Sequence, residues 1–127
     1  MLPFTVRVDK GQPVYEQLVY GAKKAILSGQ LRPGDAFPSV RQLSAELRIN
    51  PNTAQKAIAA LQAEGLLNAI PGVGTVVANL APGTRSQRER LLGADVERLA
   101  VDAKRLSISL EDVQRALAQH WRRLEKP

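Results

Sequence analysis

The sequence contains no cysteine and only one histidine among its 127 residues. The absence of cysteine excludes disulfide bonds and fits a reducing compartment. Without cysteine and with a single histidine, the chain lacks the usual ligands of a structural or catalytic zinc site, so we expect no metal site. No apolar run approaches the roughly 20 residues of a membrane span, and the polar segment 5–12 does not resemble a signal peptide. We therefore predict a soluble cytoplasmic protein.

The sequence also lacks the residue combinations that enzymes use. It has no nucleophile–base pair, no phosphate-binding loop and no histidine near a carboxylate cluster. The pair Gly72 and Gly74 stands without the rest of a dinucleotide-binding fingerprint. We interpret His120 as a packing or surface residue, and we expect neither catalysis nor a cofactor.

The net charge of +6 divides evenly along the chain. Residues 1–80 carry eight Lys and Arg against five Asp and Glu, and residues 81–127 carry ten against seven. A basic excess suits a polyanionic partner, although many soluble proteins share it. The length suits one small domain with an appendage.

The first 50 residues are predicted to hold a short strand and two helices. Residues 5–8 have the pattern of a short edge strand. A helix is expected from Pro13, in the first helical position, to Leu27, because apolar residues recur there at helical spacing. Ser39 is placed to cap a second helix, with Gln42 completing a capping box.

The next segment, 51–64, is predicted to be an amphipathic helix. Asn50 is expected to cap it, Pro51 takes its first position and Gly65 ends it. Its predicted buried stripe consists of Ala54, Ala57, Ile58 and Leu61. The polar residues near its start therefore point away from the core, and they are Asn52, Thr53, Gln55 and Lys56.

Segments 66–70 and 75–78 are apolar or β-branched and flank Pro71–Gly74, a pattern that predicts a hairpin. Two short helices joined by a tight turn and followed by a hairpin are typical of a winged helix-turn-helix. We therefore predict a mainly α fold with a small β-hairpin, in which residues 1–80 form a winged helix-turn-helix DNA-binding domain.

Residues 81–127 are predicted to form two helices, each with a narrow apolar seam. The seam residues are Leu92, Val96, Leu99, Ala103 and Leu106 on the first helix, and Leu110, Val113, Leu117, Trp121 and Leu124 on the second. Ser109 and Asp112 resemble the start of the second helix. Because this tail is too thin to be a domain, it must bury its seams against a partner, and a second copy is the simplest candidate. The predicted dimer interface is Leu92, Val96, Leu99, Leu106, Val113, Leu117 and Trp121.

Reading bases in a major groove requires side chains with paired donors and acceptors at a helix N-terminus. Asn52 and Gln55 can bond adenine bidentately, and Lys56 can reach guanine or a phosphate. Thr53, Arg41 and Ser39 suit phosphate or neighbouring base contacts.

Structural roles are the alternative for several of these residues. Asn50 is interpreted chiefly as a cap, and Thr53 equally well satisfies local backbone. Arg41 and Lys56 could be ordinary solvated charges. Tyr15 and Tyr20, in the first helix, are interpreted as packing residues.

The ordered motifs resemble the GntR family of bacterial transcription regulators over roughly residues 13–78. They are Tyr15-Glu-Gln17, the segment Ile26–Asp35, the segment Phe37–Leu43, the segment Asn50–Thr53 and Glu64-Gly-Leu66. The short tail is similar to the YtrA-type branch, whose two tail helices make a dimer. The resemblance implies DNA contacts from Arg41, Asn50, Asn52, Thr53, Gln55, Lys56 and the wing glycine, Gly72.

Two positions depart from the family pattern. Pro51 stands where many relatives have a basic residue, and the wing segment 68–74 carries no charge. A neutral wing predicts few phosphate contacts and a shallow salt dependence.

The favoured hypothesis is a dimeric repressor that binds a palindromic operator of double-stranded DNA through helix 51–64. The alternative is a winged-helix protein-interaction module without DNA binding. A small-molecule effector would have to bind between the tail and the winged domain or in the dimer interface, and the sequence equally allows regulation without one.

Overall fold

The computed structural model describes residues 1–7, 9 and 11–125. The elements, in chain order, are α1 (Val14–Leu27), α2 (Val40–Leu47), α3 (Pro51–Ala63), β1 (Leu67–Ile70), β2 (Gly74–Val77), α4 (Arg85–Arg90), the π-helical turn η1 (Leu91–Asp95), α5 (Val96–Arg105) and α6 (Leu110–Glu125). The chain divides into two compact units, residues 1–80 with residues 124–125 at the end of α6, and residues 81–123. None of the described helices is long and apolar enough to cross a membrane.

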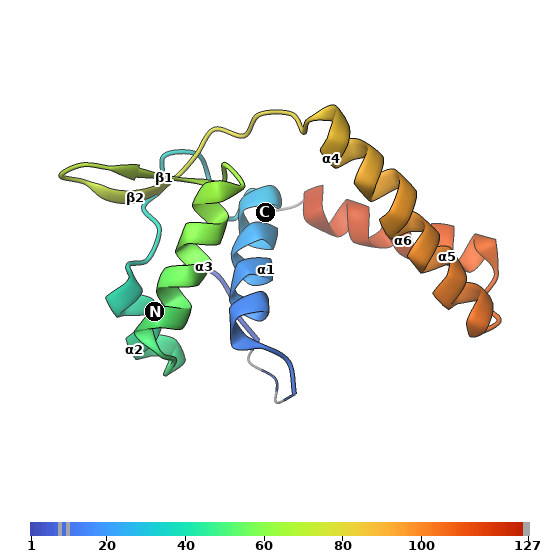
Figure 1. The fold of residues 1–127 in the computed structure, drawn as a ribbon, viewed down its shortest axis with the longest axis horizontal. Helices are drawn as coiled ribbons and strands as arrows, with labels where there is room; N and C mark the ends of the chain where they lie inside the picture. Colours follow the sequence, from blue (N-terminus) through green and yellow to red (C-terminus); the bar gives the residue numbers. More distant parts are fainter. Residues whose placement is uncertain (8, 10, 126–127) are drawn as a thin grey trace. The chain divides into compact units, whose positions relative to one another are not determined.

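In the first unit, α3 packs against both α1 and α2 (Figure 1). Its core includes the fully buried side chains of Leu18, Leu43 and Leu61, one from each of these helices. The rings of Phe4 and Phe37 stack beside them with their centroids 5.5 Å apart. The core thus holds α3 against two supporting helices and leaves its opposite face uncovered.

The hairpin pairs β1 with β2 in antiparallel register, from Leu67 opposite Val77 to Ile70 opposite Gly74. The segment before α2 joins the free edge of β2 through an isolated bridge between Ala36 and Val76. The pairing of β1 with β2 confirms the predicted hairpin. The bridge at Ala36 adds a very short third edge that the sequence did not predict.

Two predictions for the N-terminal segment were wrong. Residues 5–7 form no strand, and the last residue of that prediction, 8, lies outside the described residues. The segment instead passes over α1 at Gly21, where an added Cβ would come within 3.2 Å of the carbonyl oxygen of Thr5. Pro13 is the residue that precedes α1 rather than its first helical residue, because its ψ of 127° is not helical.

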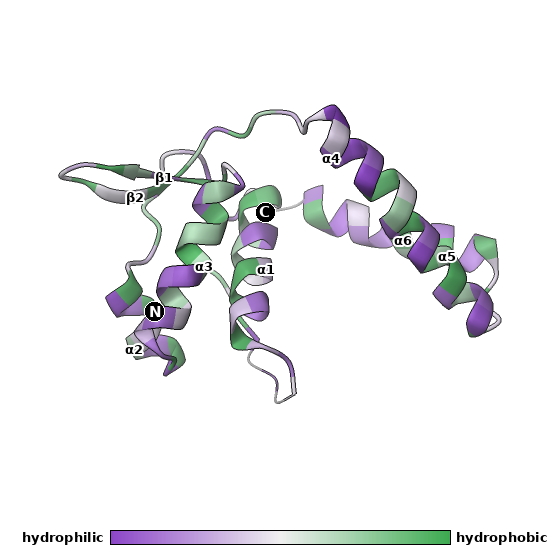
Figure 2. Cartoon of the chain, viewed as in Figure 1, coloured by the Kyte–Doolittle hydropathy of each residue, from purple (hydrophilic) through white to green (hydrophobic). Residues whose placement is uncertain are grey.

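In the second unit, α4, η1 and α5 follow one another without a break and α6 follows a turn (Figure 1). Thr84 caps α4 in a complete capping box with Gln87. The hydroxyl of Ser109 accepts a hydrogen bond of 3.1 Å from the amide of Asp112, as the sequence predicted. The π-helical turn was not predicted. Hydrophobic and hydrophilic segments alternate along these helices (Figure 2).

Candidate nucleic-acid interface

The third helix, α3, has one buried and one exposed face, as the sequence predicted. Ala54, Ala57, Ile58 and Leu61 are buried in the core. The side chains of Asn52, Gln55 and Lys56 are exposed, and that of Thr53 is half-buried at the border. We call these four residues the reading surface. They share the first two turns of α3, so a partner that approaches this end of the helix meets all of them.

The N-terminus of α3 has no spare backbone donors. Pro51 carries no N–H, and the amide of Asn52 donates to the side-chain oxygen of Asn50 over 2.8 Å. The amides of Thr53 and Ala54 both donate to the carbonyl oxygen of Asn50. Asn50 is therefore a helix cap, and any contact made by this end of α3 must come from side chains.

The first turn of α2 offers a different kind of donor. The hydroxyl of Ser39 accepts a hydrogen bond of 3.1 Å from the amide of Gln42, which confirms Ser39 as the cap. Among the described residues, the amides of Val40 and Arg41 have no hydrogen-bond partner. The Arg41 side chain is exposed in the same turn. Backbone amides and a guanidinium at one helix start suit a phosphate group.

The connection between α2 and α3 is short and sharply bent. Arg48 ends α2 in the left-handed conformation, with φ of 54° and ψ of 50°. The amide of the next residue, Ile49, donates to the carbonyl oxygen of Ser44. This turn fixes α3 relative to α2 and thereby fixes Arg41 relative to the reading surface.

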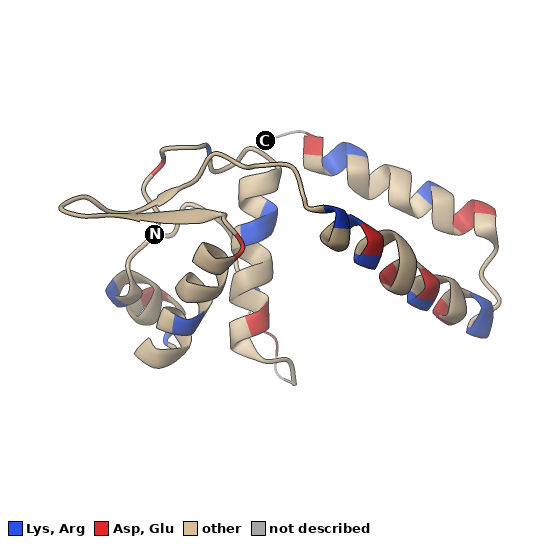
Figure 3. Cartoon of the chain, turned by 45° about the horizontal axis from the view of Figure 1, so that its top comes forward, with Lys and Arg blue, Asp and Glu red and all other residues tan. Residues whose placement is uncertain are grey.

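Positive charge lies on α2 and α3 but not on the hairpin (Figure 3). The tip of the hairpin is apolar, and the side chain of Val73 is 71% exposed. Gly72 is exposed beside it with φ of 78°, a conformation that glycine adopts without strain. The tip, Pro71–Gly74, can contribute backbone and apolar contacts only, because it has no polar side chain.

Elsewhere on α2, hydrogen bonds from the Met1 amino group and from the Gln42 side chain lower the pKa of the Glu46 carboxyl group. This carboxylate is thereby engaged within the protein.

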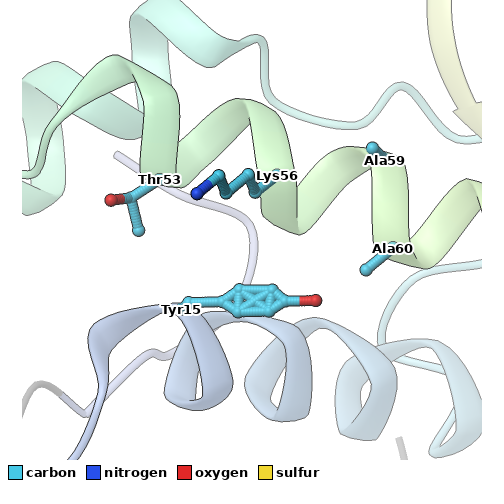
Figure 4. Close-up of a pocket in the computed structure, with 5 residues that line it drawn as sticks. All are labelled: Tyr15, Thr53, Lys56, Ala59 and Ala60. Carbon is cyan, nitrogen blue, oxygen red and sulfur yellow. The ribbon is translucent and has the colours of Figure 1, made fainter.

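A shallow groove of about 610 Å³ lies between α1 and α3. It is lined by Tyr15, Thr53, Lys56, Ala59 and Ala60. Figure 4 shows Thr53 and Lys56 extending from α3 above the ring of Tyr15 on α1. The groove therefore shares two residues with the reading surface. The sequence predicts only a packing role for Tyr15, because the spacing of residues along α1 does not show that this side chain lies beside α3.

The predicted interface residues of the tail are mostly exposed in the single chain. The side chains of Leu92 and Trp121 are 69% and 66% exposed, and Val96, Leu99, Leu106 and Leu117 are exposed as well. Val113 is half-buried. Residues 81–123 thus present an apolar surface that their own unit does not cover.

Comparison with known proteins adds independent findings. The model of the bacterial regulatory proteins of the gntR family matches residues 12–77. The HTH-type transcriptional repressor YtrA of Bacillus subtilis is 34% identical over 100 residues, which cover 78% of this chain and 77% of that protein.

Two structures from Listeria monocytogenes are similar in fold. A GntR family transcriptional regulator superimposes with a TM-score of 0.63 at 26% identity, over 88% of this chain and 98% of that one. A transcriptional antiterminator gives a TM-score of 0.84 at 22% identity, over 98% and 93% of the two chains, and at that identity shows the fold alone. These likenesses confirm the predicted winged helix-turn-helix fold.

Proposed function

Because the chain belongs to the gntR family of bacterial regulatory proteins, we propose that it is a dimeric repressor that binds a palindromic operator through the recognition helix 51–64. Family membership makes it a DNA-binding transcription regulator rather than an enzyme. The similarity to the repressor YtrA of B. subtilis supports repression rather than activation. In this proposal residues 1–80 bind DNA in the cytoplasm and residues 81–127 form the dimerisation and effector region.

The observation that carries the proposal is the amphipathic character of α3, which has a buried apolar face and an exposed polar face. Its buried stripe fixes the helix in the core, while its exposed residues include amide and ammonium groups suited to base edges. We assign base contacts to Asn52 and Gln55, and Lys56 is placed to reach a guanine base or a neighbouring phosphate. The phosphate contacts are assigned to Ser39, Arg41, Thr53 and the backbone at Gly72, with Asn50 holding the helix start.

The uncovered apolar surface of the tail supports the proposed dimer. Burying one leucine side chain contributes about 1.5–3 kcal/mol, and monomeric proteins rarely leave many such side chains exposed together. A second copy presents the same surface, so a two-fold dimer buries both at once. Two recognition helices about 34 Å apart would then meet successive major grooves, which requires two inverted half-sites.

The test is binding of the purified full chain to the DNA upstream of its own gene, followed by fluorescence anisotropy at several salt concentrations. We expect salt-sensitive binding that Arg41→Ala and Lys56→Ala each weaken about tenfold or more. Lys24→Ala is the matched control, because Lys24 is exposed in the last turn of α1 and lies outside the proposed contacts.

Wild-type protein that gives no binding, or variants of Arg41 and Lys56 that bind as Lys24→Ala does, would refute the proposal. Footprints over two inverted half-sites would support a dimer on a palindrome, whereas a single protected half-site would contradict it.

A further inference from the structure

The groove between α1 and α3 combines polar groups with an apolar floor. Lys56 and Thr53 supply an ammonium and a hydroxyl from α3, Tyr15 supplies a phenol from α1, and Ala59 and Ala60 supply methyl groups. In Figure 4 the hydroxyl of Tyr15 points along the groove toward Ala60, while the ammonium of Lys56 points toward Thr53. Polar groups therefore stand at the Thr53 end and in the middle of the lining, and the methyl groups of Ala59 and Ala60 form its other end.

This combination matches the chemistry of a nucleic-acid strand. Phosphates require donors or positive charge, and the deoxyribose between them presents C–H groups that pack against rings and methyl groups. The groove is open to solvent along its length, which suits a strand that passes through it better than a small molecule, since small-molecule sites enclose most of their ligand. Lys56 gives the groove a positive charge.

The groove also continues the reading surface. On an α-helix each residue turns the side-chain direction by about 100°, so Thr53, Lys56 and Ala60 lie on the flank of α3 that faces α1. Asn52 and Gln55 lie on the other side of Lys56, away from that flank. A duplex whose base edges meet Asn52 and Gln55 therefore has a backbone strand close to the groove.

We propose that this groove holds the sugar–phosphate backbone of one operator strand and that the Tyr15 hydroxyl donates a hydrogen bond to one of its phosphates. The inference rests on the proposed DNA binding and adds α1 to the interface. Tyr15 fixes the position of α3 on the duplex and does not read sequence, because phosphates are the same at every step.

The test replaces Tyr15 with phenylalanine, which removes the hydroxyl and keeps the ring that packs between the helices. Tyr20→Phe is the matched control, since Tyr20 lies on the same helix, is 67% exposed and does not line the groove. We expect Tyr15→Phe to weaken binding about tenfold, by similar factors on operator and random duplex, and Tyr20→Phe to bind as the wild type does.

Salt dependence separates the roles of the two polar residues. Tyr15 is neutral, so Tyr15→Phe should leave the slope of log K against log salt unchanged, whereas Lys56→Ala should reduce it by about one. A methylphosphonate at a single position of each half-site should weaken wild-type binding and have no further effect on Tyr15→Phe.

The result that overturns the inference is wild-type affinity in Tyr15→Phe while Arg41→Ala and Lys56→Ala lose affinity, which would leave the proposed function intact. The inference would likewise be overturned if a small molecule bound in the groove while Tyr15→Phe kept full affinity for DNA. A wild-type protein that binds no duplex would refute the proposed function itself.

Discussion

The side-chain oxygen of Asn50 accepts a hydrogen bond of 2.8 Å from the backbone amide of Asn52, two residues further along the chain. From the sequence, both asparagines are candidates for DNA contacts, but this bond gives them different roles. The Asn50 side chain holds the helix start, and the Asn52 side chain remains exposed for a partner. The two residues should therefore differ in what their removal affects.

Asn50→Ala should lower the free energy of unfolding by about 1 kcal/mol, because the amide of Asn52 loses its acceptor. Asn50→Ser should preserve most of the stability, since serine caps helices nearly as well as asparagine. Urea unfolding followed by circular dichroism measures both.

Asn52→Ala is the inverse control. It should leave unfolding unchanged while it reduces discrimination between the operator and a single-base variant by about 1–3 kcal/mol. Equal stability of Asn50→Ala and wild type would contradict the assignment of the cap.

Arg48→Gly should raise the stability of the winged domain by about 1 kcal/mol. Arg48 has φ of 54°, in the left-handed region that costs residues with a Cβ and costs glycine little. Ala45→Gly, an exposed position inside the same helix, should do the opposite and lower stability by about 1 kcal/mol. The urea midpoints of the two variants, compared at the same dependence of the unfolding free energy on urea, show whether each substitution raises or lowers stability. If Arg48→Gly lost stability, the Arg48 side chain would have to stabilise the fold by more than its left-handed backbone costs.

Val73→Lys should steepen the salt dependence of DNA binding, because it places one positive charge at the tip of an uncharged hairpin. One added phosphate contact changes the slope of log K against log salt by about 0.9, and affinity at low salt should rise. Leu27→Lys, at the opposite end of α1 from Tyr15, is the control and should leave the slope near the wild-type value. If the two lysine variants gave the same slope, the hairpin tip would lie away from the duplex.

Leu99→Glu should shift the proposed dimer toward monomer, because it would bury a carboxylate against the apolar surface of the second copy. Val101→Glu is a close control, since Val101 is also exposed on α5 but two residues further on points to another side of the helix. Sedimentation equilibrium at micromolar concentration measures the distribution. A dimer that persists in Leu99→Glu but dissociates in Val101→Glu would move the interface to the other face.

Much of the winged domain was predictable because its signals are local. The stripe from Ala54 to Leu61 gives the buried face of α3 at helical spacing, and both caps of the recognition region are visible as Ser39 and Asn50. The hairpin follows from β-prone residues on either side of Pro71–Gly74. Each of these features depends on residues a few positions apart.

The missed features depend on contacts between distant segments. The bridge from Ala36 to β2 joins a turn to a strand forty residues later in the chain. Tyr15 and Lys56 line one groove only because α1 packs on α3. The π-helical turn around Gly93 lies inside a segment whose apolar residues keep helical spacing. The spacing therefore predicts an uninterrupted α-helix and does not reveal the π-turn.

The closed hydrogen bonding at the start of α3 has a consequence for how such a regulator evolves. Asn50 and Pro51 already account for the backbone hydrogen bonding at the start of α3, and the buried stripe fixes the position of the helix. The exposed side chains of Asn52 and Gln55 are therefore not needed for folding. In the proposed interface, changes at Asn52 or Gln55 should therefore redirect the protein to a new operator without loss of folding. On the same assignment, a duplicated copy of the gene would need few substitutions to acquire a separate set of targets.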